Sequence, residues 1–293
     1  MTQMTLFERL KNGERLLSDG GMGTELQNRG LKPGECPEAY NLEHPDIVQA
    51  IHQDYYDAGS DMVQTNTFGG NRIRLKRHRA EDKVYLYNKR AAELAREICP
   101  QGKYVAGSIG PSGEMMEPYG QWTQQQMYDV FVEQARALAD GGVDILFVET
   151  MMMIEEAETA LRAAKESTSL PVAATMTFEQ TDRGVHTSWG VTPQMAVQRL
   201  TDGGADILGS NCGDGVEVMI AAMNAMRPLT PLPLLAQPNA GRPEIVDKKA
   251  VYTTTPEVMQ PQISALLHTG INLLGGCCGT RPQHIAMMRR LLV

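Results

Sequence analysis

A unit that repeats four times along the chain constrains the fold more than any other sequence feature. Each copy closes a helix-like stretch with a glycine, turns through a polar residue and continues into a short apolar run. The copies lie at 57–63, 140–146, 202–208 and 268–274. A glycine at the C-terminal end of a helix, followed by a tight turn and a buried strand, is typical of proteins with parallel strands.

Apolar runs of strand length extend this pattern over the whole chain. The predicted strands are 15–19, 62–66, 103–109, 144–149, 171–177, 206–211, 232–237 and 271–276. The predicted helices are 45–58, 83–98, 123–140, 154–167, 192–202, 216–226, 255–269 and 281–292. Thr123, Thr192 and Thr255 are candidate N-caps, the last followed by Pro256.

Eight strand and helix units in 293 residues predict an α/β protein, a (β/α)8 TIM barrel formed as a single domain over residues 1–293. A doubly wound open sheet is the alternative. No Gly-x-Gly-x-x-Gly turn follows the first predicted strand, which weakens the dinucleotide-binding version of that alternative.

Composition and charge exclude several classes of protein. The net charge of −8 disfavours a nucleic-acid partner. No segment approaches about 18 uninterrupted apolar residues, so no membrane span is expected. The first 17 residues lack the apolar core of a signal peptide, and an odd number of cysteines, five, indicates a reducing cytoplasm. We interpret the basic run at 72–79 as a solvated surface of a loop and helix.

Three cysteines form the most specific chemical signal. Cys277 and Cys278 are adjacent and flanked by glycines, and Cys212 lies in an earlier Asn-Cys-Gly segment. A disulfide between neighbouring cysteines is disfavoured, because consecutive Cα atoms lie about 3.8 Å apart and relaxed disulfides need about 5.5 Å. The pattern indicates a three-thiolate Zn²⁺ site that keeps its fourth position for a substrate. Cys36 and Cys99 have no such context, and we assign both to structure.

The barrel would bring these cysteines together with polar residues at one rim, because active sites of this fold lie at the C-terminal ends of the strands. The predicted strand ends are Asp19-Gly20-Gly21, Asn66-Thr67-Phe68, Ser108-Ile109-Gly110, Glu149-Thr150, Thr175-Met176-Thr177, Asn211-Cys212, Pro238-Asn239-Ala240 and Cys277-Cys278. None carries a lysine, which disfavours an aldolase-like barrel whose zinc is only structural.

With these motifs in place, the chain resembles the homocysteine S-methyltransferase family. That family includes the homocysteine-binding module of cobalamin-dependent methionine synthase, betaine–homocysteine methyltransferase and enzymes that use S-methylmethionine. The resemblance extends from Asp19-Gly20-Gly21-Met22-Gly23-Thr24 to Gly275-Gly276-Cys277-Cys278-Gly279-Thr280. It implies a barrel that binds zinc through Cys212, Cys277 and Cys278, with the homocysteine sulfur in the open position, and that makes methionine.

The resemblance also assigns substrate contacts. It implies that Asp19, Gly20 and Glu149 hold the amino-acid end of homocysteine, with backbone N–H groups of Gly20 and Gly21 suited to the carboxylate. A carboxylate at Glu149 suits an ammonium group; the alternatives are a salt bridge for Glu149 and turn capping for Asp19. Asn239 would fill the fourth zinc position before substrate binds, or be a turn residue. Asn66, Thr67 and Phe68 complete the predicted substrate site.

The sequence leaves two classes of methyl donor as alternatives. An onium donor such as betaine or S-methylmethionine would need aromatic faces, for which the candidates are Tyr40, Phe68, Tyr119, Trp122 and Trp189. The stretch from Gly69 to Arg79 is similar to short bacterial betaine-type enzymes. The segment from Pro238 to Pro243 is similar to the methionine synthase module, which would imply a methylcorrinoid protein as donor.

Two further expectations follow. Trp189 stands where relatives usually have small residues, and would narrow the donor cleft or alter the acceptor. A non-enzymatic alternative is a thiol-binding zinc subunit that works only with a corrinoid-carrying partner.

Overall fold

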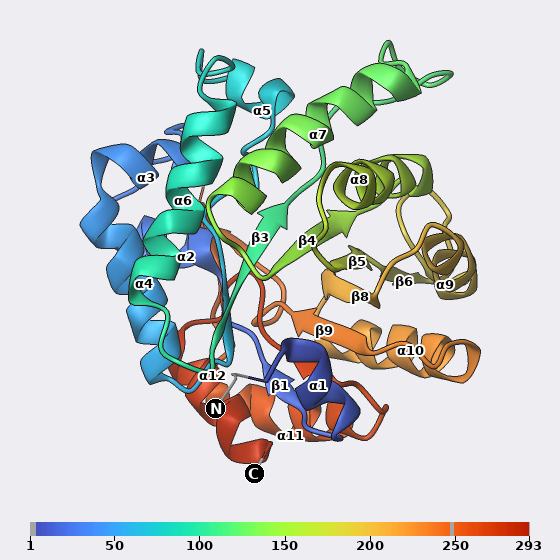
Figure 1. The fold of residues 1–293 in the computed structure, drawn as a ribbon. Coiled ribbons are helices and arrows are strands. Elements are labelled where there is room, and N and C mark those ends of the chain that lie inside the picture. Colours follow the sequence, from blue (N-terminus) through green and yellow to red (C-terminus); the bar gives the residue numbers. More distant parts are fainter. Residues whose placement is uncertain (1–3, 247–248, 293) are drawn as a thin grey trace.

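The eight predicted strands form one parallel sheet, with helices arranged around it (Figure 1). The computed structural model describes residues 4–246 and 249–292. The strands are β1 (Leu16–Leu17), β2 (Met62–Gln64), β3 (Tyr104–Ile109), β4 (Ile145–Met151), β5 (Val172–Met176), β8 (Ile207–Cys212), β9 (Leu234–Pro238) and β12 (Leu273–Leu274). Each pairs with its neighbours in chain order from β2 to β12, and β12 pairs in parallel with β1. This return to the first strand confirms the TIM barrel and makes the doubly wound alternative wrong.

Eight outer helices alternate with the strands and match the predicted ones within a few residues. They are α4 (Pro45–Asp57), α6 (Val84–Ile98), α7 (Gln124–Asp140), α8 (Ile154–Ser167), α9 (Pro193–Asp202), α10 (Val216–Met226), α11 (Pro256–Leu267) and α12 (Pro282–Leu291). The repeated glycines have the expected left-handed backbone, with φ of 105°, 88°, 84° and 81° at Gly59, Gly142, Gly204 and Gly270.

The predicted N-caps are confirmed at two helices. The side chains of Thr123 and Thr192 accept hydrogen bonds from the backbone N–H groups of Gln126 and Met195. Thr255 occupies the N-cap position of α11 with Pro256 next to it, but its side chain makes no capping hydrogen bond.

Several short elements lie in the loops and were not predicted. They are α1 (Leu6–Lys11), α2 (Met22–Asn28), α3 (Tyr40–Glu43), α5 (Arg72–Lys76), the 3-10 helices η1 (Pro37–Ala39) and η2 (Arg227–Leu229), and the hairpins β6 (Glu179–Thr181) with β7 (Gly184–His186) and β10 (Glu244–Val246) with β11 (Lys249–Val251). Within the described ranges, no helix is long and apolar enough to cross a membrane.

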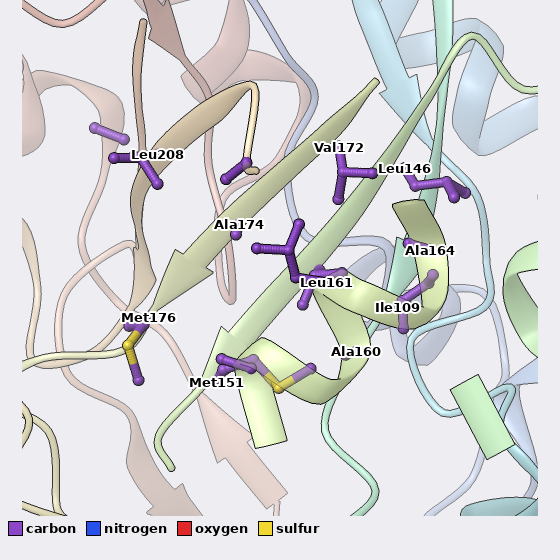
Figure 2. Close-up of a cluster of buried hydrophobic side chains, with 14 of the residues drawn as sticks. Ile109, Leu146, Met151, Ala160, Leu161, Ala164, Val172, Ala174, Met176 and Leu208 are labelled. Carbon is purple, nitrogen blue, oxygen red and sulfur yellow. The ribbon is translucent and has the colours of Figure 1, made fainter. Parts of the chain in front are cut away.

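The side chains of each strand alternate between two apolar layers. Leu146 and Val148 of β4 face the outer layer, where β4, β5 and β8 pack against Leu161 and the alanines of α8 (Figure 2). Ile145 and Phe147 face the barrel interior, which α1 closes at the N-terminal end of the strands with Leu6 and Leu10. The interior is therefore apolar at its base, and Glu149, next in the same inward row, opens a polar layer at the other end.

Side chains complete the barrel between β1 and β2, where no strand ladder forms. The Asp61 N–H donates to the Leu17 carbonyl at 2.6 Å, and the Leu17 N–H donates to the Asp61 carboxylate at 2.9 Å. The Asp19 carboxylate makes a similar contact nearer the C-terminal ends of the two strands, where it accepts a hydrogen bond from the Gln64 N–H at 2.8 Å. The two carboxylates thus act as the acceptors that a neighbouring strand would otherwise supply.

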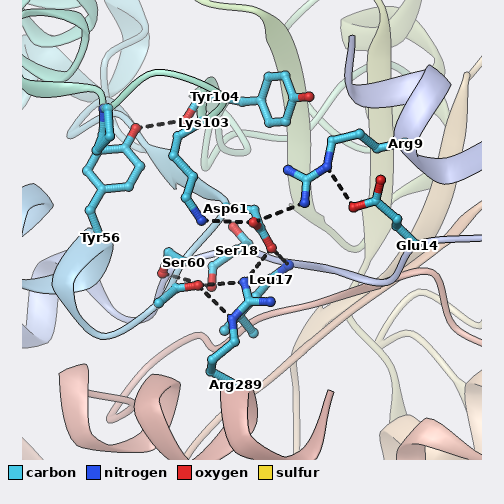
Figure 3. Close-up of polar contacts among 12 residues, drawn as sticks. Arg9, Glu14, Leu17, Ser18, Tyr56, Ser60, Asp61, Lys103, Tyr104 and Arg289 are labelled. Carbon is cyan, nitrogen blue, oxygen red and sulfur yellow. Dashed lines mark hydrogen bonds and ion pairs between the residues drawn. The ribbon is translucent and has the colours of Figure 1, made fainter. Parts of the chain in front are cut away.

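Asp61 also binds three cations from separate parts of the chain (Figure 3). Lys103 lies 2.9 Å from its carboxylate, Arg9 lies 3.3 Å away, and Arg289 of α12 forms a further ion pair. Burial opposes ionisation of Asp61, but the hydrogen bonds from Lys103 and Arg289 outweigh it, so that its pKa is lowered. Asp61 therefore stabilises the fold above its ordinary pKa of about 4, and this contribution is lost as the pH falls through the lowered value.

We expect Asp61→Ala to lower the free energy of unfolding at pH 7 by about 2–4 kcal/mol, because it leaves the half-buried Lys103 and Arg289 and the backbone N–H of Leu17 without their acceptor. Urea titrations at pH 7 and near pH 3 measure the effect, which should shrink at the lower pH. The control is Asp57→Ala, since Asp57 is exposed at the end of α4. Equal losses in the two variants would contradict this role of Asp61.

Candidate functional site

A cavity of about 640 Å³ opens at the C-terminal ends of the strands. Its lining comes from the loops after β1, β2 and β12 and from the ends of β4 and β8. Eight of the residues predicted for the site line it: Gly20, Asn66, Thr67, Phe68, Glu149, Cys212, Cys277 and Cys278. The structure thus places these eight residues around one cavity at the C-terminal ends of the strands.

The three cysteines meet at this cavity. Their sulfur atoms all lie within 4.8 Å of one another, and the three form a group that could hold a metal ion. Cys212 shares the outward row of Leu208 in β8, so a regular strand would point it away from the barrel. Its left-handed backbone, with φ of 63°, breaks the alternation. Such strain in a residue other than glycine is commonly found at functional sites.

The cluster favours a single negative charge, which lies on the Cys212 sulfur. Hydrogen bonds from the Cys277 and Cys278 thiols stabilise the Cys212 thiolate and lower the pKa of Cys212. The same coupling raises the pKa of Cys277 and of Cys278, since a second thiolate beside the first is repelled. Three thiolates at these separations therefore require a cation among them.

Two glycines bring the loop after β1 against the loop that carries the cysteine pair. A Cβ on Gly20 would lie 2.8 Å from the Thr280 hydroxyl, and a Cβ on Gly21 would lie 2.8 Å from the Cys277 carbonyl oxygen. The Gly21 N–H donates to the Thr280 carbonyl at 3.0 Å. The Gly21 N–H is thus engaged within the protein, and the expectation that it receives a carboxylate is wrong. Gly20 is buried and forms part of the cavity wall.

Glu149 faces the cavity from the end of β4 and is 7% exposed. Its carboxylate accepts hydrogen bonds from the Ser108 hydroxyl and, at 3.0 Å, from the Asn211 amide. Burial raises the pKa of Glu149 to about 7, although the Ser108 hydrogen bond opposes the shift. No salt bridge to Glu149 is found in the described part of the chain, so the alternative of a structural ion pair is not supported.

Asn211 connects Glu149 to the cysteines, and its role in the site was not predicted. Its amide donates to the Thr150 hydroxyl at 2.7 Å and lies 3.9 Å from the Cys277 sulfur, while its oxygen accepts from the Thr150 N–H and the Thr175 hydroxyl. Thr150 has a left-handed φ of 62°, like Cys212. In the sequence, the one indication of a role for Asn211 was its position at the end of a predicted strand, next to Cys212.

Two predicted substrate residues lie behind the cavity wall instead of lining it. Asp19 is fully buried and hydrogen-bonded to Gln64 and Ser18, and burial raises its pKa to about 7. Asn239 is 4% exposed, and its amide donates to the Gly213 carbonyl at 2.8 Å. A buried Asn239 oxygen has no hydrogen-bond partner among the described residues. Direct contact of either side chain with substrate stays a prediction.

Comparisons with known proteins agree with this geometry. The family model described as homocysteine S-methyltransferase matches residues 16–292. The chain belongs to the homocysteine S-methyltransferase family. This assigns it to a family of methyltransferase enzymes.

Relatives of the homocysteine S-methyltransferase family match over most of the chain. Methionine synthases of Mycobacterium leprae and Mycobacterium tuberculosis are each 31% identical over 290 residues, covering 92% of this chain and 24% of the relative. The chain therefore spans about a quarter of the length of these curated relatives. The metallated form of the homocysteine methyltransferase MmuM from Escherichia coli is 25% identical, with a TM-score of 0.78, covering 96% of this chain and 97% of that one. Its oxidized form gives a TM-score of 0.79 with the same coverage and identity.

Of the aromatic residues considered for a homocysteine S-methyltransferase donor site, only Phe68 lines the cavity. Tyr40 is buried in the outer layer, and Trp122 packs against that layer. Trp189 is 43% exposed and packs on Tyr119, with ring centroids 5.6 Å apart. Trp189 is not among the residues that line the cavity, and a narrower donor cleft or an altered acceptor through this side chain stays a prediction.

Several cavity residues were missed, and two of them, Tyr252 and Arg74, bear on the chemistry of the site. Tyr252, just after β11, packs its ring on Gly279, where a Cβ would lie 2.2 Å from the ring. Arg74 of α5 is half-buried and lines the cavity beside Phe68. The interpretation of 72–79 as a solvated surface is thus wrong for Arg74, while Arg72 and Lys76 are exposed as expected.

Proposed function

We propose that this protein is a zinc-dependent S-methyltransferase that transfers a methyl group to the sulfur of homocysteine and forms methionine. Residues 1–293 would be the homocysteine-binding domain. The observation that carries the proposal is the cluster of Cys212, Cys277 and Cys278 at the rim of a barrel of this family. The relatives that bear the names homocysteine methyltransferase and methionine synthase support the same acceptor.

The chemistry of the donor set supports zinc as the metal. Cys212, Cys277 and Cys278 would hold the ion, because soft thiolates suit Zn²⁺ and tetrahedral Zn–S bonds of about 2.3 Å bring sulfurs to about 3.8 Å from one another. The sulfur separations within 4.8 Å are compatible with that geometry. Bound there, zinc would supply a Lewis acid that keeps the homocysteine sulfur deprotonated at neutral pH, where a thiol of pKa near 8.5 is mostly protonated.

Residues of the chain would orient the amino acid. Glu149 offers a buried carboxylate to the ammonium group, a charge-assisted hydrogen bond that fixes one end of homocysteine. Asn211 holds that carboxylate at a set position relative to Cys277. The enclosed cavity would exclude water from the sulfur, and alignment of sulfur and methyl carbon then governs the displacement. The sulfur forms the new S–C bond as the donor departs with the electron pair of the broken bond.

The donor would be an onium compound, such as betaine or S-methylmethionine, or a methylcorrinoid. The second class is favoured by one observation, the match to about a quarter of each mycobacterial methionine synthase. In that case the protein is the thiol-binding zinc subunit of a corrinoid methyltransferase system and is inactive alone. Its location would be cytoplasmic, in keeping with the absence of a membrane-spanning helix from the described residues.

The test incubates zinc-loaded protein with homocysteine and one donor at a time, namely betaine, S-methylmethionine, dimethylsulfoniopropionate or methylcobalamin. Methionine is quantified by mass spectrometry. Formation from any of these supports the enzyme, and formation only after addition of a corrinoid-carrying protein supports the subunit. No methionine under either condition would contradict the proposed function.

A further inference from the structure

Basic side chains of α5 and of the residues after it line one wall of the cavity. An aromatic cage that binds an onium group would not contain such positive charges. The Arg74 guanidinium lies 5.2 Å from the centroid of the Phe68 ring, and both side chains line the cavity. Arg77 and His78 lie on the same wall. Phe68 is therefore already covered by a cation of the protein, which leaves that ring unsuited to hold a cationic donor.

Two carboxylates lie near the charge of Arg74, one of them, Glu38, in the cavity lining itself. Glu38 and Glu156 are the nearest carboxylates that act on it, and both are buried and engaged with backbone N–H groups. Glu38 accepts from the Gly69 N–H at 2.7 Å, and Glu156 accepts from the Ser112 N–H at 2.7 Å. Within 4–246 and 249–292, no carboxylate forms an ion pair with the Arg74 guanidinium, and its N–H groups have no hydrogen-bond acceptor.

The neighbouring arginines differ from Arg74 in this respect. Arg72 forms a two-point ion pair with Glu133 on the exterior, and Arg77 pairs with Glu114 at 3.2 Å. Arg281, the other arginine of the cavity, pairs with Glu25 at 2.8 Å. Of the arginines that line the cavity, Arg74 is thus the one whose guanidinium N–H groups have no acceptor among the described residues. A planar guanidinium can donate two parallel hydrogen bonds to a carboxylate or a phosphate.

We propose that Arg74 binds an anionic group, a carboxylate or a phosphate, of the methyl donor. The inference rests on the proposed function, because it assigns a subsite to the second substrate of that reaction. The cysteine sulfurs and the Arg74 guanidinium line the same cavity. A donor with a positive methyl-bearing centre and an anionic tail would be oriented with its methyl group toward the sulfurs.

The test measures equilibrium binding without homocysteine, so that it does not depend on methyl transfer. Isothermal titration of the zinc-loaded full chain compares betaine, phosphocholine and choline, which share a trimethylammonium group and carry a carboxylate, a phosphate or a hydroxyl. We expect one of the two acids to bind about 10-fold to 100-fold more tightly than choline, and the acid that does so identifies the anion.

Variants of α5 assign the effect to one side chain. Arg74→Gln should remove the preference for the acid, and Arg74→Lys should keep part of it because the charge remains. The matched control is Arg72→Gln, which removes the same charge from the same helix outside the cavity and should leave the preference unchanged. Circular dichroism checks that each variant is folded.

Four results would overturn the assignment, and the first three concern donor binding. They are equal affinity for choline and both acids in the wild type, absence of binding by either acid at millimolar concentration, and a preference that survives Arg74→Gln. A fourth is loss of homocysteine affinity in Arg74→Gln, which would place the acceptor amino acid on Arg74. Failure of the proposed function would instead appear as the absence of methionine in the donor screen, whatever the binding data show.

Discussion

Cys277→Ala is expected to abolish stoichiometric zinc and to lower methionine formation by about 10³-fold, equivalent to about 4 kcal/mol of transition-state stabilisation. Cys277 supplies one of three sulfur atoms that lie within 4.8 Å of one another, and two thiolates would hold the ion weakly. Elemental analysis of the purified variant gives the zinc content, and methionine assays with whichever donor is active give the rate.

The control for this variant is Cys99→Ala, which removes a cysteine after the end of α6, away from the cavity. It should retain zinc and activity. The barrel of Cys277→Ala should remain folded, because its apolar interior and outer layer do not involve the site. A full complement of zinc in Cys277→Ala would show that the ligand assignment is wrong.

Glu149→Gln is expected to raise the KM for homocysteine by about 10-fold to 100-fold with a smaller effect on kcat, because it removes a charge from a contact made in both ground and transition states. Burial raises the pKa of Glu149 to about 7, so that the carboxyl becomes neutral as the pH falls below this value. The wild-type KM for homocysteine should therefore rise from pH 8 to pH 6. In Glu149→Gln the rise over that window should be smaller, because only the deprotonation of the homocysteine thiol then depends on pH.

An acceptor without the amino group separates this role from a general defect. 4-Mercaptobutanoate keeps the thiol and the carboxylate of homocysteine, and its KM should be insensitive to Glu149→Gln. Glu155→Gln, which removes an exposed carboxylate from the first turn of α8, is the matched variant and should behave as wild type. Equal losses for the two acceptors would refute an ammonium contact by Glu149.

The sequence was sufficient for the barrel and for most of its rim, because both follow from local rules. Gly59, Gly142, Gly204 and Gly270 end helices with left-handed backbones, a requirement visible in the repeated unit itself. Residues that end parallel strands must share one edge, so Glu149 and the three cysteines were placed together without knowledge of their distances.

Residues whose positions depend on loop paths or on closure of the sheet were not predicted. Arg74 belongs to a run of basic residues, and only the fold of α5 against Phe68 places it in the cavity while Arg72 faces solvent. Trp189 follows the β6–β7 hairpin, whose path carries it out onto Tyr119. Asp19 is used across the gap between β1 and β2, an irregularity that no periodicity reveals.

The network at Asp61 makes ring closure depend on distant parts of the polypeptide. Its carboxylate needs Arg9, Lys103 and Arg289, which lie in α1, next to β3 and in α12. During synthesis on the ribosome, Arg289 emerges after both strands, so the Asp61 carboxylate lacks one of its three cations until α12 has been made. The contact between β1 and β2 should therefore be the last part of the barrel to fold. It should also be the first part to open when α12 detaches, because Arg289 then leaves Asp61.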